Sequence, residues 1–226
     1  MKASTVSSAR RARRPSGKSS ADAILIGAKR LFLAEGYDGV NLERIAEAAG
    51  VSRQTVYNQF GSKEAVFRSM IEFHWASINR DDIFSNLHKA RVLENPKAIL
   101  NRFADAIFRF VSDTDQIAFT RLVISESRRL PWIGQEFYRL GKQPLLRAFV
   151  VCIEKMIEDR QLSCQNPELA AHQFLGLIQE FIIWPRVMAI GPAILEIPPD
   201  KVVIEEAIRM FLGRYRVDRD ITPFRP

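Results

Sequence analysis

The sequence predicts an all-α protein, and two observations support this fold class. Apolar residues recur at helical spacing from Ala21 onward, as at Ile24, Ala28, Leu31 and Phe32, which indicates one buried helix face. No alternating pattern of apolar and polar residues between turn signals indicates a strand. With 226 residues, of which 47% are hydrophobic, the chain is long enough to bury a core without disulfides or metal ions.

The first part of the chain is predicted to form four helices with clear end signals. Gly36 ends the first helix, and Asn41 caps the second. Gly50 breaks the chain after the second helix, where glycine tolerates a left-handed conformation. Ser52 and Ser62 then cap two further helices.

Longer helices are predicted for the rest of the chain. Asn95–Pro96 and Asn166–Pro167 each combine a capping residue with a proline that suits the first helical turn. Pro198–Asp200 opens a last helix, and Pro185 is expected to end or kink the helix before it. Prolines leave the helix boundaries within Pro131–Gln161 open.

Residues 41–60, with the sequence NLERIAEAAGVSRQTVYNQF, have the layout of a helix-turn-helix. Gly50 gives the turn its backbone freedom, and Val56 and Phe60 anchor the second helix from inside. The outer face of that helix is polar and free to enter the major groove of DNA. A structural helical hairpin with a solvated polar face is the alternative.

The residue types on this outer face suit DNA. Gln and Asn fit adenine edges, Arg fits guanine, and Tyr and Ser fit phosphates, while Lys63 adds a positive charge at the start of the next helix. The candidate DNA-binding residues of the motif are Asn41, Ser52, Arg53, Gln54, Thr55, Tyr57, Asn58, Gln59 and Lys63.

The net charge of +7 is distributed unevenly along the chain. Six of the 33 basic residues lie in residues 1–20, which hold no acid, and the remaining 27 nearly balance the 26 acidic residues. Residues 1–20 lack apolar periodicity, so we predict a disordered basic arm. This arm is expected either to contact DNA phosphates or to be inert. Its candidate contacts are Arg10, Arg11, Arg13 and Arg14.

Residues 21–74 resemble the DNA-binding domain of the TetR/AcrR family of bacterial regulators. The resemblance rests on the string AKRLFLAEGYDGVNLERIAEAAGVSRQTVYNQFGSKEAVF. The later strings FTRLVISESRRLPWIGQEFY and AAHQFLGLI resemble an AefR-like C-terminal domain. Asn41 stands in place of the family's usual threonine, and Gln54 and Gln59 replace its common glycine and histidine. These departures change which bases are read.

The resemblance implies a homodimer with a DNA-binding head over residues 21–66 and a ligand-binding and dimerisation body over residues 67–226. Aromatic and apolar residues of the body are candidates for an effector cavity, although ordinary core packing is the alternative. These residues are Trp75, Phe103, Ile107, Phe110 and Phe174. Polar candidates for orienting a ligand are Arg121, Glu126 and His172. The alternative for Arg121 and Glu126 is an ion pair or a solvent-facing side chain, and for His172 it is a satisfied core or surface histidine.

The family resemblance also implies that the last two long helices form the dimer interface, as a four-helix bundle across a two-fold axis. The alternative is that their apolar stripes only close the core of one subunit. The predicted interface residues are Ile178, Phe181, Ile182, Ile204, Ile208, Phe211 and Leu212.

Several other classes of protein are disfavoured. No histidine or acidic cluster has metal-ligand spacing, and no nucleophile or phosphate-binding motif occurs, so we expect no enzyme, metal or cofactor. Cys152 and Cys164 lack a redox spacing. No apolar run is long enough for a membrane span, and the basic N-terminus lacks the apolar segment of a secretory signal, so a cytoplasmic protein is expected.

The expected function is therefore that of a ligand-responsive repressor, which binds a pseudo-palindromic operator as a dimer and is released by a small, largely apolar effector. One alternative is an activator or ligand-independent regulator on the same fold. A small-molecule-binding protein without specific DNA binding is an alternative from a different class.

Overall fold

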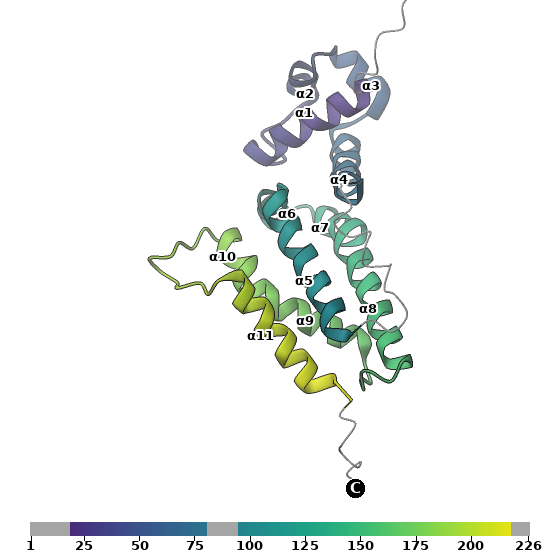
Figure 1. Cartoon of the computed structure of the whole chain (residues 1–226). Coiled ribbons are helices and arrows are strands. Elements are labelled where there is room, and N and C mark those ends of the chain that lie inside the picture. Colours follow the sequence, from purple (N-terminus) through teal and green to yellow (C-terminus); the bar gives the residue numbers. More distant parts are fainter. Residues whose placement is uncertain (1–18, 81–94, 218–226) are drawn as a thin grey trace, which may run out of the picture.

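The computed structural model describes residues 19–80 and 95–217. Helices dominate these ranges, and no β-strand forms within them, which confirms the all-α prediction. Figure 1 shows a small N-terminal head joined by one long helix to a larger helical body. The arginines at positions 10, 11, 13 and 14 lie outside the described residues.

The head contains three helices and the start of a fourth. These are α1 (Ser20–Glu35), α2 (Leu42–Ala49), α3 (Arg53–Phe60) and α4 (Lys63–Arg80). Ser19 caps α1, because its hydroxyl accepts a hydrogen bond from the Asp22 amide at 3.1 Å. The helix thus begins within the last two residues of the predicted arm. The predicted boundary between head and body at residue 66 falls inside α4, which belongs to both parts.

The core of the head is aromatic. Phe32 and Phe67 are fully buried, and their ring centroids lie 4.8 Å apart in an edge-to-face arrangement. Tyr37 packs edge-to-face on Phe67 and also on Trp132 of the body, with centroids 5.3 and 5.9 Å apart. Burying one such side chain contributes about 1.5–3 kcal/mol. The aromatic cluster therefore fixes the head to the body as well as closing its own core.

The body is built from α5 (Pro96–Asp113), α6 (Gln116–Ser127), α7 (Pro131–Phe137), the π-helix η2 (Tyr138–Lys142), α8 (Gln143–Glu158), α9 (Pro167–Ile182), α10 (Trp184–Val187) and α11 (Asp200–Tyr215). The predicted proline-led starts of α5, α9 and α11 are confirmed. The helix before Pro185 ends at Ile182, and the proline lies in the first turn of the short α10.

The region that the sequence left open is one continuous helical segment with a π-turn in it. Pro144 has no amide hydrogen to donate to the carbonyl four residues earlier, so an unbroken α-helix would leave that carbonyl unpaired. The π-turn η2 lies directly before the proline, and the Gln143 amide donates to the carbonyl of Tyr138. Such turns often occur at functional sites, and this one borders a cavity of the body.

Candidate DNA interface and effector cavity

Local hydrogen bonds set the geometry of the helix-turn-helix. The Asn41 side chain accepts from the Arg44 amide at 2.9 Å and starts α2. Gly50 ends α2 in the left-handed conformation, with φ of 67°. The Ser52 hydroxyl accepts from the Thr55 amide at 3.1 Å and lies 2.8 Å from the Thr55 hydroxyl. The hydroxyls of Ser52 and Thr55 therefore already stabilise the start of α3.

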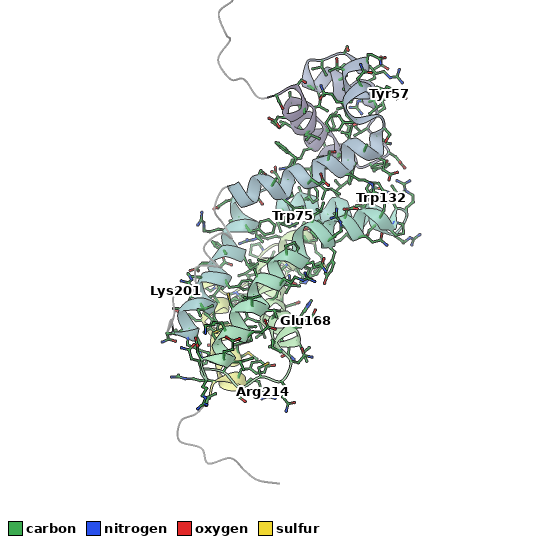
Figure 2. All side chains as sticks on the ribbon, turned by 90° about the vertical axis from the view of Figure 1, so that its right-hand side faces the viewer. Tyr57, Trp75, Trp132, Glu168, Lys201 and Arg214 are labelled. Carbon is green, nitrogen blue, oxygen red and sulfur yellow. The ribbon has the colours of Figure 1, made fainter. Side chains whose placement is uncertain are left out.

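The outer face of α3 is open to solvent, as the sequence predicted. Val56 is fully buried, whereas the next residue, Tyr57, points away from the core and is 56% exposed. The amide of Gln54 donates to the side-chain oxygen of Asn58 at 2.7 Å, which orients both groups on the exposed face. Arg53 is exposed as well. Figure 2 shows Tyr57 at the far end of the head, away from the body.

Two of the predicted DNA-binding residues have partners outside the helix-turn-helix segment of residues 41–60. The Gln59 side chain donates to the Ser20 hydroxyl at 2.7 Å and so ties α3 to α1. Lys63 donates to the carbonyl of Tyr37 at 3.0 Å, and its ammonium lies 4.2 Å from the centroid of the Tyr37 ring. Helical spacing within residues 41–63 could not predict either contact, because Ser20 and Tyr37 lie in earlier parts of the chain.

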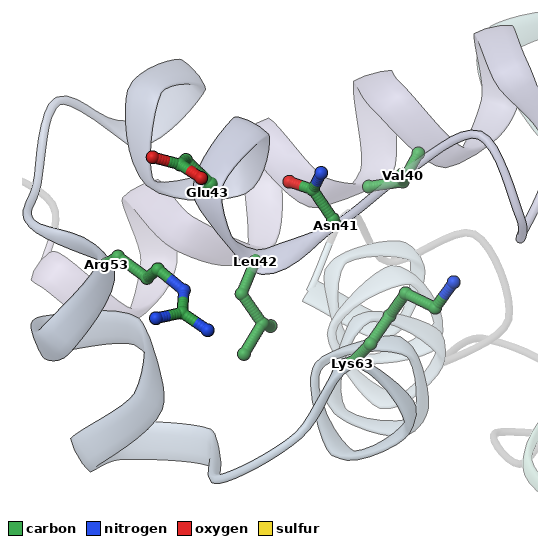
Figure 3. Close-up of a pocket in the computed structure, with 6 residues that line it drawn as sticks. All are labelled: Val40, Asn41, Leu42, Glu43, Arg53 and Lys63. Carbon is green, nitrogen blue, oxygen red and sulfur yellow. The ribbon is translucent and has the colours of Figure 1, made fainter.

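A surface hollow of about 400 Å³ lies between the start of α2 and α3. Figure 3 shows its lining residues, which include Asn41 and Arg53, with the Lys63 ammonium directed away from Arg53. The first amides of α2 are at this hollow, and unpaired amides at a helix N-terminus favour an anion. The hollow and the exposed face of α3 together make a surface that suits a phosphate backbone and the base edges beside it.

The body contains an apolar cavity of about 140 Å³, lined by residues of α4 to α10 and of the π-turn. Three of the predicted cavity residues, Trp75, Ile107 and Phe110, line it. Phe103 and Phe174 do not. They are fully buried in the core instead, where Phe103 stacks on Phe149 with centroids 3.8 Å apart. A helical stripe does not distinguish cavity walls from core, because both are apolar.

The three predicted polar ligand contacts lie away from this cavity. Arg121 donates to the carbonyls of Val187 and Arg186 at 2.8 and 2.6 Å and holds α10 against α6. Glu126 accepts from the Tyr37 amide at 3.1 Å and joins the body to the head. His172 is exposed on α9 and borders a different hollow. The alternatives raised from the sequence describe these places better, since Arg121 is exposed, Glu126 forms an ion pair with Arg129 at 3.0 Å, and His172 is a surface histidine.

Sequence reasoning missed a buried polar group beside the cavity. His74 is 1% exposed, its ring stacks on Phe119 at a centroid distance of 4.4 Å, and its Nε2 lies 3.2 Å from the Gln116 Oε1. The Gln116 amide nitrogen donates to the Thr120 hydroxyl at 3.0 Å, and Gln116 and Thr120 line the cavity. Position 74 lies four residues after Met70 and therefore continues the buried stripe of α4. This spacing was the signal in the sequence that could have indicated a buried histidine.

Burial lowers the pKa of His74 to about 4, and the positive charge of Lys29 acts in the same direction. The hydrogen bond to Gln116 and the negative charge of Asp115 oppose this shift. Lys29 on α1 is itself paired with Asp115 at 2.8 Å. His74 is therefore neutral at pH 7, and it lies where the head, the body and the cavity meet.

Most of the residues predicted for the dimer interface are buried within one subunit. The exceptions, Phe181 and Leu212, are half-buried. The buried residues are Ile178, Ile182, Ile204, Ile208 and Phe211. They face the core because α9 and α11 pack on each other and on α5. This burial favours the alternative that the apolar stripes close the core of one subunit, although Phe181 and Phe211 also line the groove described next. Dimerisation through these helices stays a prediction.

The outer side of α9 and α11 forms a groove of about 610 Å³. Its lining includes Gly176, Leu177, Phe181 and Met210, and the Met210 side chain is 59% exposed. A second subunit would bury this apolar surface, which makes the groove the candidate dimer face. Within residues 19–80 and 95–217, no three potential metal ligands gather, and no helix has the length and apolar character needed to cross a membrane.

The exposed polar helix on a three-helix head, followed by a helical body with a cavity, defines a helix-turn-helix protein with a separate sensing domain. Residues 24–70 match the bacterial regulatory proteins of the TetR family, and residues 98–217 match the C-terminal domain of AefR-like transcriptional repressors. The second match covers more than half of the chain. The chain belongs to the TetR family.

Individual relatives support this assignment. The chain is 43% identical over 63 residues to the HTH-type transcriptional regulator EthR of Mycolicibacterium smegmatis, a match that spans 28% of this chain and 29% of the relative. It is 28% identical over 94 residues to the transcriptional activator FasR of the same organism, across 41% of each chain. These matches thus span less than half of the relatives' length.

A solved structure extends the likeness to nearly the whole fold. The structure of the flavonoid-responsive regulator FrrA superposes with a TM-score of 0.68 at 29% identity. The superposition covers 87% of this chain and 97% of that one. The body as well as the head therefore has the architecture of a solved TetR-type regulator.

Proposed function

We propose that this chain is an effector-responsive transcriptional repressor that binds a pseudo-palindromic operator as a homodimer. The observation that carries the proposal is the exposed polar face of α3, on which Tyr57 is 56% exposed while Val56 is buried in the core. Arg53, Gln54 and Asn58 read base edges in the major groove, and Tyr57 contacts phosphate. Family membership supports this assignment of roles.

The groove on α9 and α11 is the proposed dimer face. A two-fold axis through it would present two heads to successive major grooves, about 34–36 Å apart. The arm of residues 1–20 adds sequence-independent attraction to phosphates. Such a protein acts in the bacterial cytoplasm and needs no catalytic group, metal or cofactor.

The cavity beside Trp75 is the proposed effector site. An effector releases the operator only if it binds the DNA-competent and the released states with different affinity. The cavity is placed for this coupling, because Trp75 lies on α4 and Gln116 lies on α6. The start of α4 is part of the head, and the Lys29–Asp115 ion pair joins the start of α6 to α1 of the head.

The decisive experiment is fluorescence anisotropy with DNA from upstream of the chain's own gene, at about 100 mM salt. Tyr57→Phe should weaken binding to all sequences by a similar factor, whereas Gln54→Ala should relax preference at particular base pairs. Tyr138→Phe is a matched control in the body, where Tyr138 is 42% exposed. If the wild-type protein binds operator and scrambled DNA equally, the chain is not a sequence-specific regulator.

Activation is the second candidate function, since the relative FasR is named an activator. A reporter gene behind the bound promoter separates the two, because deletion of the regulator raises expression under repression and lowers it under activation. A protein that binds small molecules without specific DNA binding would fail the anisotropy experiment while still binding a ligand.

A further inference from the structure

The lining of the body cavity is unbalanced in charge. Lys142 is the one ionic residue among the described side chains that line it, and the same lining holds no carboxylate. Lys142 is half-buried at the end of the π-turn, and no ion pair joins it to an acid in residues 19–80 or 95–217. A cation held beside apolar surface favours an anion, because water is partly excluded there.

The lining of the cavity also includes the neutral polar side chains of Gln116, Thr120 and Gln179. The indole nitrogen of Trp75 has no partner, but it is fully buried in the wall, so a ligand atom in the cavity does not reach it unless the wall moves. The Thr120 hydroxyl accepts from Gln116, so its own hydrogen is free to be donated. An unpaired buried donor costs about 1–3 kcal/mol. The Trp75 nitrogen bears this cost whether or not the cavity is filled, so an acceptor oxygen of a ligand would pair with the Thr120 hydroxyl instead.

The walls of the cavity are aromatic. The ring of Trp75 lies 5.3 Å from Phe110 with an interplanar angle of 27°, and 5.6 Å from Phe137. Trp184 lines the cavity as well. Flat rings packed at such distances favour a flat, ring-bearing ligand, since stacking adds about 0.5–1.5 kcal/mol to area burial.

The volume of the cavity sets the size of the ligand. About 140 Å³ is available, and an apolar cavity of about 150 Å³ is known to admit benzene. One six-membered ring therefore fits without rearrangement. A larger ligand would need the walls to move.

We propose that this cavity binds a small aromatic carboxylate, with its ring against Trp75 and Phe110 and its carboxylate at Lys142. The proposal rests on the proposed effector site and names the chemical class of the effector. A carboxylate fits better than a phenol, because a phenol with a pKa near 10 keeps its proton at pH 7. The Thr120 hydroxyl is a neutral donor available to the ligand's oxygens.

The test is isothermal titration calorimetry of the full-length protein, without DNA, with benzoate and with benzamide. The two probes have the same ring and nearly the same shape and differ in charge. Benzoate should bind with a Kd of about 1 mM or lower and at least about tenfold more tightly than benzamide. Lys142→Met should remove most of this preference, and Lys142→Arg should retain it.

Lys97→Met is the matched control, because Lys97 is exposed on α5 and does not line the cavity. It should leave both affinities unchanged. Equal binding of the two probes, no binding of either up to about 10 mM, or unchanged benzoate affinity in Lys142→Met would overturn the proposal. Operator binding is measured separately and without benzoate, so that failure of the DNA-binding proposal is distinguished from failure of this one.

Discussion

The buried His74 makes the stability of the protein depend on pH in a defined direction. Its pKa is about 4 in the folded state and 6.5 for an unperturbed side chain. Between these values the unfolded chain takes up a proton that the folded chain does not. Stability therefore falls as the pH drops through this window, and above pH 6.5 the residue adds no pH dependence.

The size of the effect follows from the pKa difference, at about 1.36 kcal/mol per unit. At pH 5 the unfolded side chain is almost fully protonated and the folded one is not, so the free energy of unfolding is lower by about 2 kcal/mol than at pH 7. Below pH 4 the loss reaches its limit of about 3 kcal/mol. His74→Phe keeps an aromatic ring against Phe119 and removes the titration.

Urea denaturation followed by tryptophan fluorescence at pH 7 and pH 5 measures this effect. His74→Phe should be less stable at pH 7, since Gln116 loses its partner, but its stability should fall by about 2 kcal/mol less than the wild type's between the two pH values. His172→Gln, at an exposed position, should behave as the wild type does. If His74→Phe and the wild type lose the same stability between pH 7 and 5, His74 is not held neutral by burial.

Three further predictions concern the dimer face, the π-turn and the contact between head and body. Met210→Glu should give monomers in size-exclusion chromatography with light scattering while leaving the helical circular dichroism unchanged, because Met210 is 59% exposed in the α9–α11 groove; a dimer would place the interface elsewhere. Gly141→Ala should cost about 1–3 kcal/mol in urea denaturation, since a Cβ there would lie 1.9 Å from a Trp75 ring atom. Gly191→Ala, where the added Cβ meets open space, should change stability by no more than about 0.5 kcal/mol, and equal effects at the two glycines would contradict the close packing. Glu126→Ala should lower the free energy of unfolding by about 1.5 kcal/mol through the loss of its bond to the head, and an unchanged value would show that this contact adds nothing.

Local patterns in the sequence were enough to predict the helix-turn-helix. Caps and turns depend on neighbouring residues, so the roles of Asn41, Gly50 and Ser52 followed from their chemistry and spacing. Helical periodicity alone predicted that Val56 of α3 is buried and that Tyr57 is exposed. The family resemblance then connected this local unit to DNA.

Only the tertiary structure decided whether an apolar residue of a helix packs in the core, lines the cavity or faces the outer groove. Phe103 and Phe110 belong to one stripe of α5, yet the first lies in the core and the second lines the cavity. Phe211 and Met210 are adjacent on α11 and both line the groove, yet the first is 3% exposed and the second 59%. Periodicity identifies a buried face without naming the helix that covers it, because that depends on contacts between distant segments.

The sequence by itself therefore determined the fold class, the position of the second helix of the helix-turn-helix and the chemistry of its outer face. Each of these depends on residues within a few turns of one another. The long-range partners came only from the packed structure. These include the bond from Glu126 to Tyr37, the burial of His74 and the place of Lys142 beside an aromatic cavity. Each depends on how helices far apart in the chain meet, and the sequence patterns of the separate helices do not contain that information.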